Sequence, residues 1–151
     1  LKRLGYLTKV NIIVNDAINW KPNQKVDAVL LDTPCSSTGT IRRNPDIVWR
    51  KDIKDILSMT KIQKKLLFSA INMVKKGCPI IYSNCSLEQE EGEEIIKYVN
   101  QNSKMTIDPI LKNEIPYISE LYIKNGLLRT FPYMLKEYGG IDGFFIARLV
   151  I

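Results

Sequence analysis

The chain has 151 residues, which fits a single domain, and 45% of them are hydrophobic, enough to build a core. Lys and Arg number 22 against 16 Asp and Glu. The resulting formal charge of +6 suits either a polyanionic partner such as RNA or an ordinary lysine-rich surface. The sequence contains no histidine, which excludes Ser-His-Asp and Cys-His catalysis and histidine metal ligands.

The cysteine count bears on the compartment in which the protein works. Three cysteines, an odd number, argue against a framework of disulfides. No apolar run is long enough to span a bilayer, and no stretch has the pattern of a signal peptide. Free thiols persist in a reducing compartment, so we expect a cytoplasmic protein.

Apolar and β-branched runs bounded by turn residues predict short strands along the chain. They fall at residues 10–14, 26–31, 78–82, 105–107, 127–131 and 144–151. Apolar residues at three- and four-residue steps predict helices at residues 51–74 and 88–100, whereas residues 113–125 show no clear pattern. This order of elements indicates a doubly wound α/β sheet, with residues 26–31 as a buried parallel strand.

Two loops leave predicted strands at the edge where an open α/β sheet binds its ligands. The first loop carries Asp32 and Cys35, the second carries Cys85, and each places a Cys-Ser pair just beyond an apolar strand. If the two strands are neighbours, the two thiols face one crevice. One such cysteine alone is better explained as a small buried side chain, but two equivalent loops favour a shared site. Cys78 begins a strand and is expected in the core or at a strand edge.

Four stretches of the sequence, taken in order, carry a family resemblance. They are Asp32-Thr33-Pro34-Cys35-Ser36 with Gly39 and residues 41–46, Asn84-Cys85-Ser86 with Glu90-Glu91, Arg129-Thr130-Phe131-Pro132, and residues 142–148. Together they resemble the Sun/RsmB family of ribosomal RNA cytosine-5 methyltransferases over nearly the whole chain. Thr33 stands where the family usually has Ala, and Asn84 where it usually has Thr. Neither departure removes a thiol or a carboxylate.

The resemblance implies a class I methyltransferase fold, a Rossmann-like sheet that is mostly parallel with a reversed C-terminal strand. In the family the cofactor domain begins with a strand and a glycine-rich turn, and no Gly-x-Gly precedes Asp32 here. We therefore expect residues 1–151 to be the C-terminal portion of the catalytic domain. The first two strands and the family's N-terminal RNA-binding module would be absent, in a fragment or in the product of a split or decayed gene.

The family's chemistry implies distinct roles for the two thiols. Cys85 would be the nucleophile that adds to carbon 6 of cytosine, so that carbon 5 can take a methyl group from S-adenosylmethionine. Cys35 would assist release as the base, although spacing alone does not decide which thiol attacks. Asp32 would lie between cofactor and base, with Pro34 and Asp16 also in the cofactor site. Without the Pro-Cys-Ser that follows it, Asp32 fits a turn or a cap equally well, and Asn15-Asp16 is a common turn pair, so the implied role of Asp16 has less support.

Cys85 must attack as a thiolate, and an unperturbed thiol has a pKa of about 8.5. The N-terminus of the helix expected from residue 88 would stabilise the anion, as would a nearby Lys or Arg. Glu90 and Glu91 would oppose it if they turned toward the sulfur. The pKa of this thiol therefore depends on which groups face it.

A basic and aromatic segment follows the first cysteine loop. Arg42, Arg43, Trp49 and Arg50 combine positive charge with an aromatic face, which suits contact with RNA phosphates and stacking on bases. A solvated loop explains these residues nearly as well when they are taken alone. The resemblance implies ribosomal RNA, 16S in particular, and the target cytosine must be unpaired or extruded to meet Cys85.

Two other functions fit parts of the sequence. An inactive RNA-binding remnant fits a chain without half of its cofactor site, whereas the retained Cys35, Cys85 and Asp32 fit an enzyme. A DNA cytosine-5 methyltransferase also uses a Pro-Cys loop, but the second Cys-Ser loop favours RNA. We expect the chain alone to be nearly inactive. Strand 26–31 would have an open edge that either self-associates or is covered by the N-terminal segment.

Overall fold

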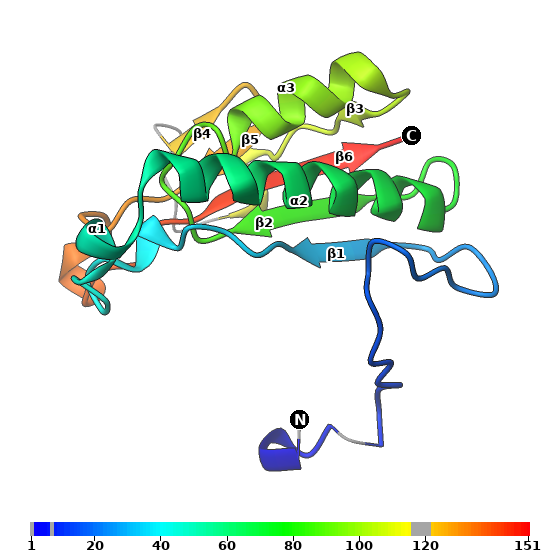
Figure 1. Ribbon diagram of the computed structural model, residues 1–151, viewed down its shortest axis with the longest axis horizontal. Helices are drawn as coiled ribbons and strands as arrows, with labels where there is room; N and C mark the ends of the chain where they lie inside the picture. The colour runs from blue at the N-terminus through cyan, green and yellow to red at the C-terminus, as the bar shows by residue number, and fades with distance from the viewer. Residues whose placement is uncertain (1, 7, 116–121) are drawn as a thin grey trace.

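A computed structural model describes residues 2–6, 8–115 and 122–151 of the chain. The α-helices and strands are β1 (Val29–Asp32), α1 (Ile47–Arg50), α2 (Ile53–Met73), β2 (Ile80–Asn84), α3 (Glu93–Asn102), β3 (Thr106–Ile107), β4 (Ile123–Lys124), β5 (Leu127–Arg129) and β6 (Phe145–Val150). Short 3-10 helices lie at η1 (Lys2–Leu4), η2 (Thr38–Thr40), η3 (Lys112–Glu114) and η5 (Lys136–Tyr138). Figure 1 shows this order, with α2 running across the sheet.

The strands form one mixed sheet in the order β1-β2-β6-β5-β4, and β3 also pairs with β6. Among the strand pairs that the structure describes, only β1 and β2 run parallel, and β6 inserts antiparallel to β2. The prediction of a mostly parallel sheet is therefore wrong, although the reversed last strand is confirmed. The reason is that a two-residue turn joins β4 to β5 as an antiparallel hairpin, and that β6 enters the sheet antiparallel to both of its neighbours, β2 and β5.

The tight turn between β4 and β5 lies within the region for which the sequence analysis found no pattern. Asn125 and Gly126 both have positive φ angles, 54° and 76°, as the two central residues of a type I′ hairpin turn require. Asn-Gly is the commonest sequence for this turn, so the signal was present. Within that region, residues 116–121 lie outside the described residues.

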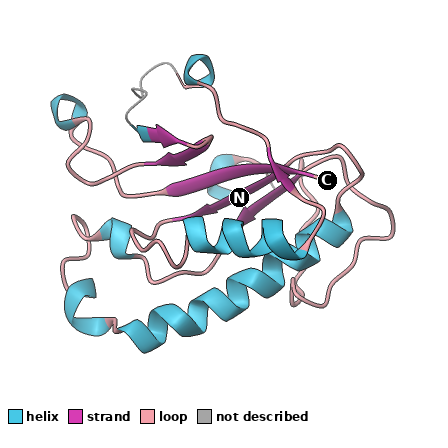
Figure 2. Ribbon diagram, turned by 90° about the horizontal axis from the view of Figure 1, so that it is seen from above, coloured by secondary structure: helices cyan, strands magenta, loops and turns pink. Residues whose placement is uncertain are grey.

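Helices α2 and α3 cover the same face of the sheet, as Figure 2 shows from above. Between them and the strands lies the core, made of Leu67, Ala70, Val74, Ile80, Tyr82, Ile95, Ile96, Val99, Met105, Phe145, Ala147 and Leu149. The described residues thus build two layers, and the prediction of helices on both faces is wrong for them. In this part of the chain, no helix has the length and apolar character needed to cross a membrane.

The prediction of helix 51–74 is confirmed by α2, which begins one residue after Asp52. The Asp52 carboxylate accepts hydrogen bonds from the backbone N–H groups of Lys54 and Asp55, at 2.8 and 3.0 Å, and so caps the first turn. The helix expected at residues 88–100 exists as α3 but begins only at Glu93. Residues 85–92 instead form a loop with turns, which becomes important at the site.

The segment expected to form the first strand, residues 10–14, is not a strand. It lies apart from the sheet (Figure 1), and Val14 is 96% exposed. A strand needs a partner for its backbone groups, and no described residue pairs with this segment. β1 itself is a half-exposed edge strand rather than a buried one, since Leu30 is 75% exposed. The N-terminal segment does not cover this edge, so that part of the expectation is wrong.

Candidate active site

The two cysteine loops lie side by side because β1 and β2 are parallel neighbours that end at the same level. Asp32, the last residue of β1, pairs with Ser83. Beyond the pair, the backbone N–H of Thr33 donates to the Ser83 carbonyl at 2.9 Å, and that of Gly39 donates to the Cys85 carbonyl at 2.9 Å. The Thr33 hydroxyl also donates to the Ser83 carbonyl, at 3.2 Å. The departure from Ala at this position therefore adds a contact between the loops.

The loops bring the two thiols together. The sulfurs of Cys35 and Cys85 lie 3.5 Å apart, and both side chains are half-buried. The Ser37 hydroxyl lies 3.6 Å from the Cys85 sulfur and 3.9 Å from that of Cys35. Ser37 reaches this place from a left-handed backbone conformation, with φ 62°. The expectation that the two loops bring their thiols together is confirmed.

The contact between the sulfurs separates the acidities of the two thiols. A hydrogen bond from Cys35 lowers the pKa of Cys85 to about 6, helped by Ser37 and opposed by burial and by the charge of Asp32. The same contact, followed by burial and by the charge of Cys85, raises the pKa of Cys35 far above its usual range. At neutral pH the pair is therefore a Cys85 thiolate that accepts a hydrogen bond from a Cys35 thiol.

The source of this acidity differs from the one expected. We expected a helix N-terminus close to Cys85, but α3 begins only at Glu93. The stabilising donors are instead two neighbouring side chains, Cys35 and Ser37. Glu91 does not turn toward the sulfur. Its buried carboxylate turns away, to the serines that follow each cysteine.

A buried polar cluster lies beneath the two loops. The Glu91 carboxylate accepts hydrogen bonds from the hydroxyls of Ser36 and Ser86 at 2.5 and 2.6 Å, from the Ser36 backbone N–H at 2.9 Å, and from the Gln63 amide at 2.9 Å. Gln63 also donates to the Pro34 carbonyl, at 2.9 Å. One helix, the first loop and the second loop thus meet at a single carboxylate.

Sequence reasoning missed two residues of this support. Gln63 is fully buried on the apolar stripe of α2, and a polar residue at a core position was the available signal. Arg129 pairs with Glu93, with 2.6 Å between its Nη2 and a carboxylate oxygen, and donates to the Ser86 carbonyl at 3.0 Å. It therefore holds the second loop to β5. Its place in the Arg-Thr-Phe-Pro stretch was the available signal.

Asn84 shows why its departure from the family's Thr is accommodated. Its side-chain amide donates to the Glu91 carbonyl at 2.7 Å, and its side-chain oxygen accepts from the Ser86 backbone N–H at 3.0 Å. The Tyr82 hydroxyl donates to the same Glu91 carbonyl, at 2.7 Å. The side chain of Asn84 thus fixes the turn that carries Cys85.

The expected cofactor residues lie in two places. Asp32 and Pro34 are exposed at the end of β1, beside the thiols, and the Ser83 hydroxyl lies 3.5 Å from an Asp32 carboxylate oxygen. The structure does not bring Asp16 to them. Among the described residues, the Asp16 carboxylate accepts only from Ile18 and Asn19, at 3.0 and 2.6 Å, within its own turn.

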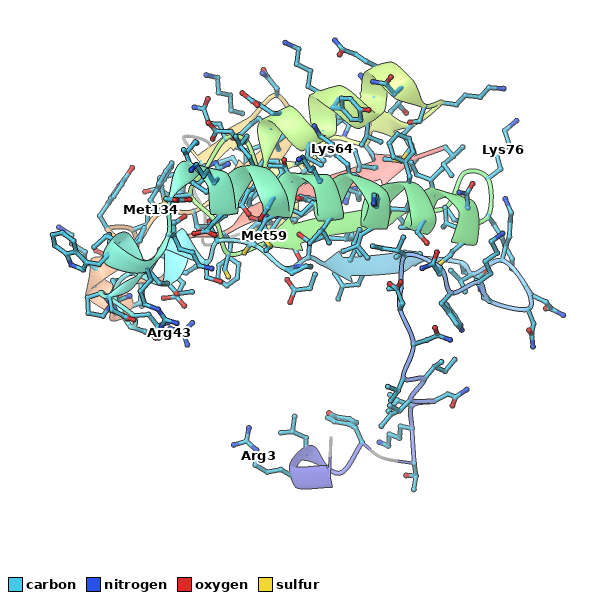
Figure 3. All side chains as sticks on the ribbon, viewed as in Figure 1. Arg3, Arg43, Met59, Lys64, Lys76 and Met134 are labelled. Atoms are coloured by element: carbon cyan, nitrogen blue, oxygen red, sulfur yellow. The ribbon has the colours of Figure 1, made fainter. Side chains whose placement is uncertain are left out.

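The expected RNA-binding residues lie between β1 and α2, at the end of the molecule where Figure 3 shows Arg43. All four are exposed, and Trp49 is 89% exposed. Arg42 donates to the Gly139 carbonyl at 2.7 Å, Arg43 pairs with Asp142, and Arg50 pairs with Asp46. Two of the three arginines thus hold the turn around residues 139–142 and still face solvent.

The fold is that of solved methyltransferases. A structure titled NSun6 from Pyrococcus horikoshii with SFG superposes with a TM-score of 0.79 at 27% identity, and the match covers 99% of this chain and 36% of that one. Residues 1–150 match the model of the 16S rRNA methyltransferase RsmB/F family. The chain belongs to this family.

Curated relatives give the extent of the match. A probable ribosomal RNA small subunit methyltransferase B of Bacillus subtilis is 32% identical, over 84% of this chain and 28% of that protein. A ribosomal RNA small subunit methyltransferase B of Citrobacter koseri is 36% identical, over 99% of this chain and 32% of that protein. The chain thus spans about a third of the length of these relatives.

Oxidation with diamide should join Cys35 to Cys85, because their sulfurs are within reach of each other. Diamide takes up the two thiol hydrogens, so peptide mass spectrometry should find the linked peptides with a mass loss of about 2 Da. Cys35→Ala should abolish the link. Cys78, at the other end of β2, should stay free, and a link between Cys78 and either loop would contradict the geometry.

Alkylation of Cys85 by iodoacetamide should follow a thiolate with a pKa of about 6. Cys35→Ala removes the donor that lowers this pKa, so the midpoint should rise by about 1 unit or more toward the ordinary value. Cys35→Ser keeps an O–H donor and should retain most of the reactivity at low pH. The measurement is the alkylation rate of the Cys85 peptide from pH 5 to 9. Equal midpoints in the unchanged chain, Cys35→Ala and Cys35→Ser would refute the hydrogen bond from Cys35 as the cause of the lowered pKa.

Proposed function

We propose that the chain is the catalytic part of an RNA cytosine-5 methyltransferase that acts on ribosomal RNA of the small subunit. The observation that carries this proposal is the contact between the Cys85 and Cys35 sulfurs, 3.5 Å apart, at the end of β1 and β2. Methylation of cytosine at carbon 5 needs one sulfur to attack carbon 6 and one base to remove the proton from carbon 5. The names of the curated relatives support ribosomal RNA as the substrate.

S-adenosylmethionine supplies an electrophilic methyl group when it is bound, and the relative solved with SFG supports it as the donor. The site offers residues that fit one side of this cofactor. The exposed Asp32 carboxylate suits the positive sulfonium group, and the exposed Pro34 ring offers an apolar contact. As in the family, Asp16 would contact the adenine amino group of the cofactor. To do so it must leave the turn in which it now lies.

The Cys85 thiolate begins the reaction on the cytosine ring. Its sulfur forms a bond to carbon 6, and the displaced electron pair makes carbon 5 nucleophilic enough to accept the methyl group. Asp32 lies beside the thiols; one oxygen of its side chain accepts from the amino group of the base, and in the acid form the other donates to ring nitrogen 3, which stabilises the negative charge that develops on the ring. The lowered pKa of Cys85 keeps the attacking sulfur in its reactive form at neutral pH.

Release of the product falls to Cys35. Once the Cys85 sulfur is bonded to carbon, it is no longer an anion, so the contact that held the proton on Cys35 is lost. Cys35 can then give its proton to solvent and take the proton from carbon 5. The electrons of that C–H bond restore the ring double bond, the bond from carbon 6 to sulfur breaks, and Cys85 leaves as a thiolate.

RNA would approach over the segment between β1 and α2. Arg42, Arg43 and Arg50 place positive charge at the mouth of the site, and the exposed indole of Trp49 offers a face on which a base can stack. The target cytosine must be unpaired or extruded to reach Cys85. The second candidate function, an inactive RNA-binding remnant, keeps this surface and loses the chemistry.

RNA that contains 5-fluorocytosine, incubated with S-adenosylmethionine, tests the proposal. Fluorine at carbon 5 cannot leave as a proton, so the covalent adduct on the attacking sulfur persists. We expect an adduct with the chain extended N-terminally by the preceding part of a curated relative, and little with the chain alone. Cys85→Ala should abolish the adduct, seen as a band retarded on a denaturing gel.

The two thiols serve as matched controls for each other. Cys35→Ala should retain the adduct, because it removes the base and not the nucleophile. The reverse pattern would mean that Cys35 attacks. An extended protein that forms no adduct but still binds RNA would support the remnant instead.

We further propose that the chain alone self-associates through the outer edge of β1. No described strand pairs with the backbone groups along this edge. Sedimentation should show dimers at micromolar concentration, and Leu30→Lys should shift the chain toward monomer by adding charge at this edge. Tyr138→Lys, at a side chain exposed to a similar degree (76% against 75% for Leu30), should change nothing. A monodisperse monomer with fast-exchanging amides at residues 26–31 would rule the proposal out.

A further inference from the structure

We propose that Glu91 is a positioning residue whose buried side-chain carboxylate clamps the two cysteine loops together and so fixes the contact between the Cys35 and Cys85 sulfurs. The inference rests on the proposed function, in which those sulfurs carry the chemistry. Glu91 touches neither sulfur. It acts through the serine that follows each cysteine in the sequence, Ser36 and Ser86.

The contacts of the carboxylate join both loops at one point. One oxygen accepts from the hydroxyls of Ser36 and Ser86, which themselves lie 3.1 Å apart. The other oxygen accepts from the Ser36 backbone N–H and from Gln63. Glu91, Ser36, Ser86 and Gln63 are all fully buried, so no water competes for these bonds. Because each serine is bonded to its cysteine neighbour, a shift of either serine moves a sulfur.

The chemistry of this position calls for a carboxylate rather than an amide. Every group that faces the Glu91 side chain donates a hydrogen, and a carboxylate accepts at both oxygens. Glutamine has the same shape but presents an N–H₂ group on one side. That group would meet either the Ser36 N–H and the Gln63 amide or the two serine hydroxyls. In the first orientation that arm of the clamp is lost, and in the second the hydroxyls must turn to accept, so that their short bonds to a carboxylate become weaker bonds to a neutral amide.

The side chain has a role separate from holding the fold. The backbone of Glu91 is anchored by its own carbonyl, which accepts from the Tyr82 hydroxyl and the Asn84 amide, each at 2.7 Å. These bonds do not involve the carboxylate. A Glu91→Gln protein therefore keeps the backbone of the loop in place and weakens the link between the loops.

The test is the pH profile of Cys85 alkylation in Glu91→Gln, measured peptide by peptide. Loosening the loops weakens the hydrogen bond from Cys35, so the midpoint should rise by about 1 unit, a tenfold loss of thiolate below the midpoint. Diamide should also link the thiols more slowly. Circular dichroism checks that the variant is folded.

The matched control is Glu90→Gln, which removes the same charge one residue earlier. Glu90 makes no hydrogen bond or ion pair to the described residues of the two loops, so its midpoint should match that of the unchanged chain. Asp32 also faces Cys85 and is untouched in both proteins. Loss of a negative charge favours the thiolate and by itself would lower the midpoint, so an equal shift in both variants, in either direction, would overturn the clamp.

Further variants cover the case in which Glu91→Gln does not fold. Ser36→Ala and Ser86→Ala each remove one arm and should each raise the Cys85 midpoint by a smaller amount. The exchange Gln63→Glu with Glu91→Gln returns a carboxylate to the cluster and should recover part of the shift. Unchanged midpoints in the folded variants would overturn the proposal. None of these measurements needs RNA or cofactor, so they stand apart from a failure of the methyltransferase assay.

Discussion

Asp32 pairs with Ser83 where β1 and β2 end side by side, and both cysteine loops leave the sheet at that level. The position of every group at the site depends on this register. A slip of one residue would move one loop by about 3.3 Å along the strands and turn its side chains to the other face of the sheet. Sulfurs that now lie 3.5 Å apart would lose contact, and the difference in acidity between the two thiols would disappear with it.

The buried cluster below the loops protects that register. A carboxylate in a protein interior is costly unless its oxygens are hydrogen-bonded, and Glu91 finds its donors in three separate elements. Hydrogen bonds to a charged group contribute about 1.5–3 kcal/mol each, more than neutral ones, so the cluster favours the one arrangement of loops that satisfies it. Arg129, on β5, pairs with Glu93 and donates to the Ser86 carbonyl, and in this way also fixes the second loop against the sheet.

The sequence was most informative where chemistry and short-range pattern coincide. Two Cys-Ser pairs after apolar strands were enough to predict that the two thiols lie close together, and the apolar repeat of α2 located that helix. The family resemblance supplied the roles, which spacing could not. Glu91 was noted as a group near Cys85, but its direction depends on Ser36, which lies far from it in the sequence.

The failures have a common physical cause, which is that pairing is decided by the rest of the sheet. Residues 10–14 have the composition of a strand, yet composition cannot provide the neighbour that a strand needs. The mixed direction of the sheet follows from β6 entering between β2 and β5, a long-range event with no local signal. Gln63 was hidden for the same reason, since its partners come from both loops.

One close contact has a consequence for how the site moves. The Gly143 N–H donates to the Gly39 carbonyl, and the Gly39 N–H donates to the Cys85 carbonyl, at 2.8 and 2.9 Å. A Cβ atom on Gly39 would lie 2.8 Å from that Cys85 oxygen, so the three backbones meet with no side chain between them. Segments joined this directly cannot slide past one another separately. Local opening of the site would therefore be cooperative, and the ends of β1, β2 and β6 would open together as one unit.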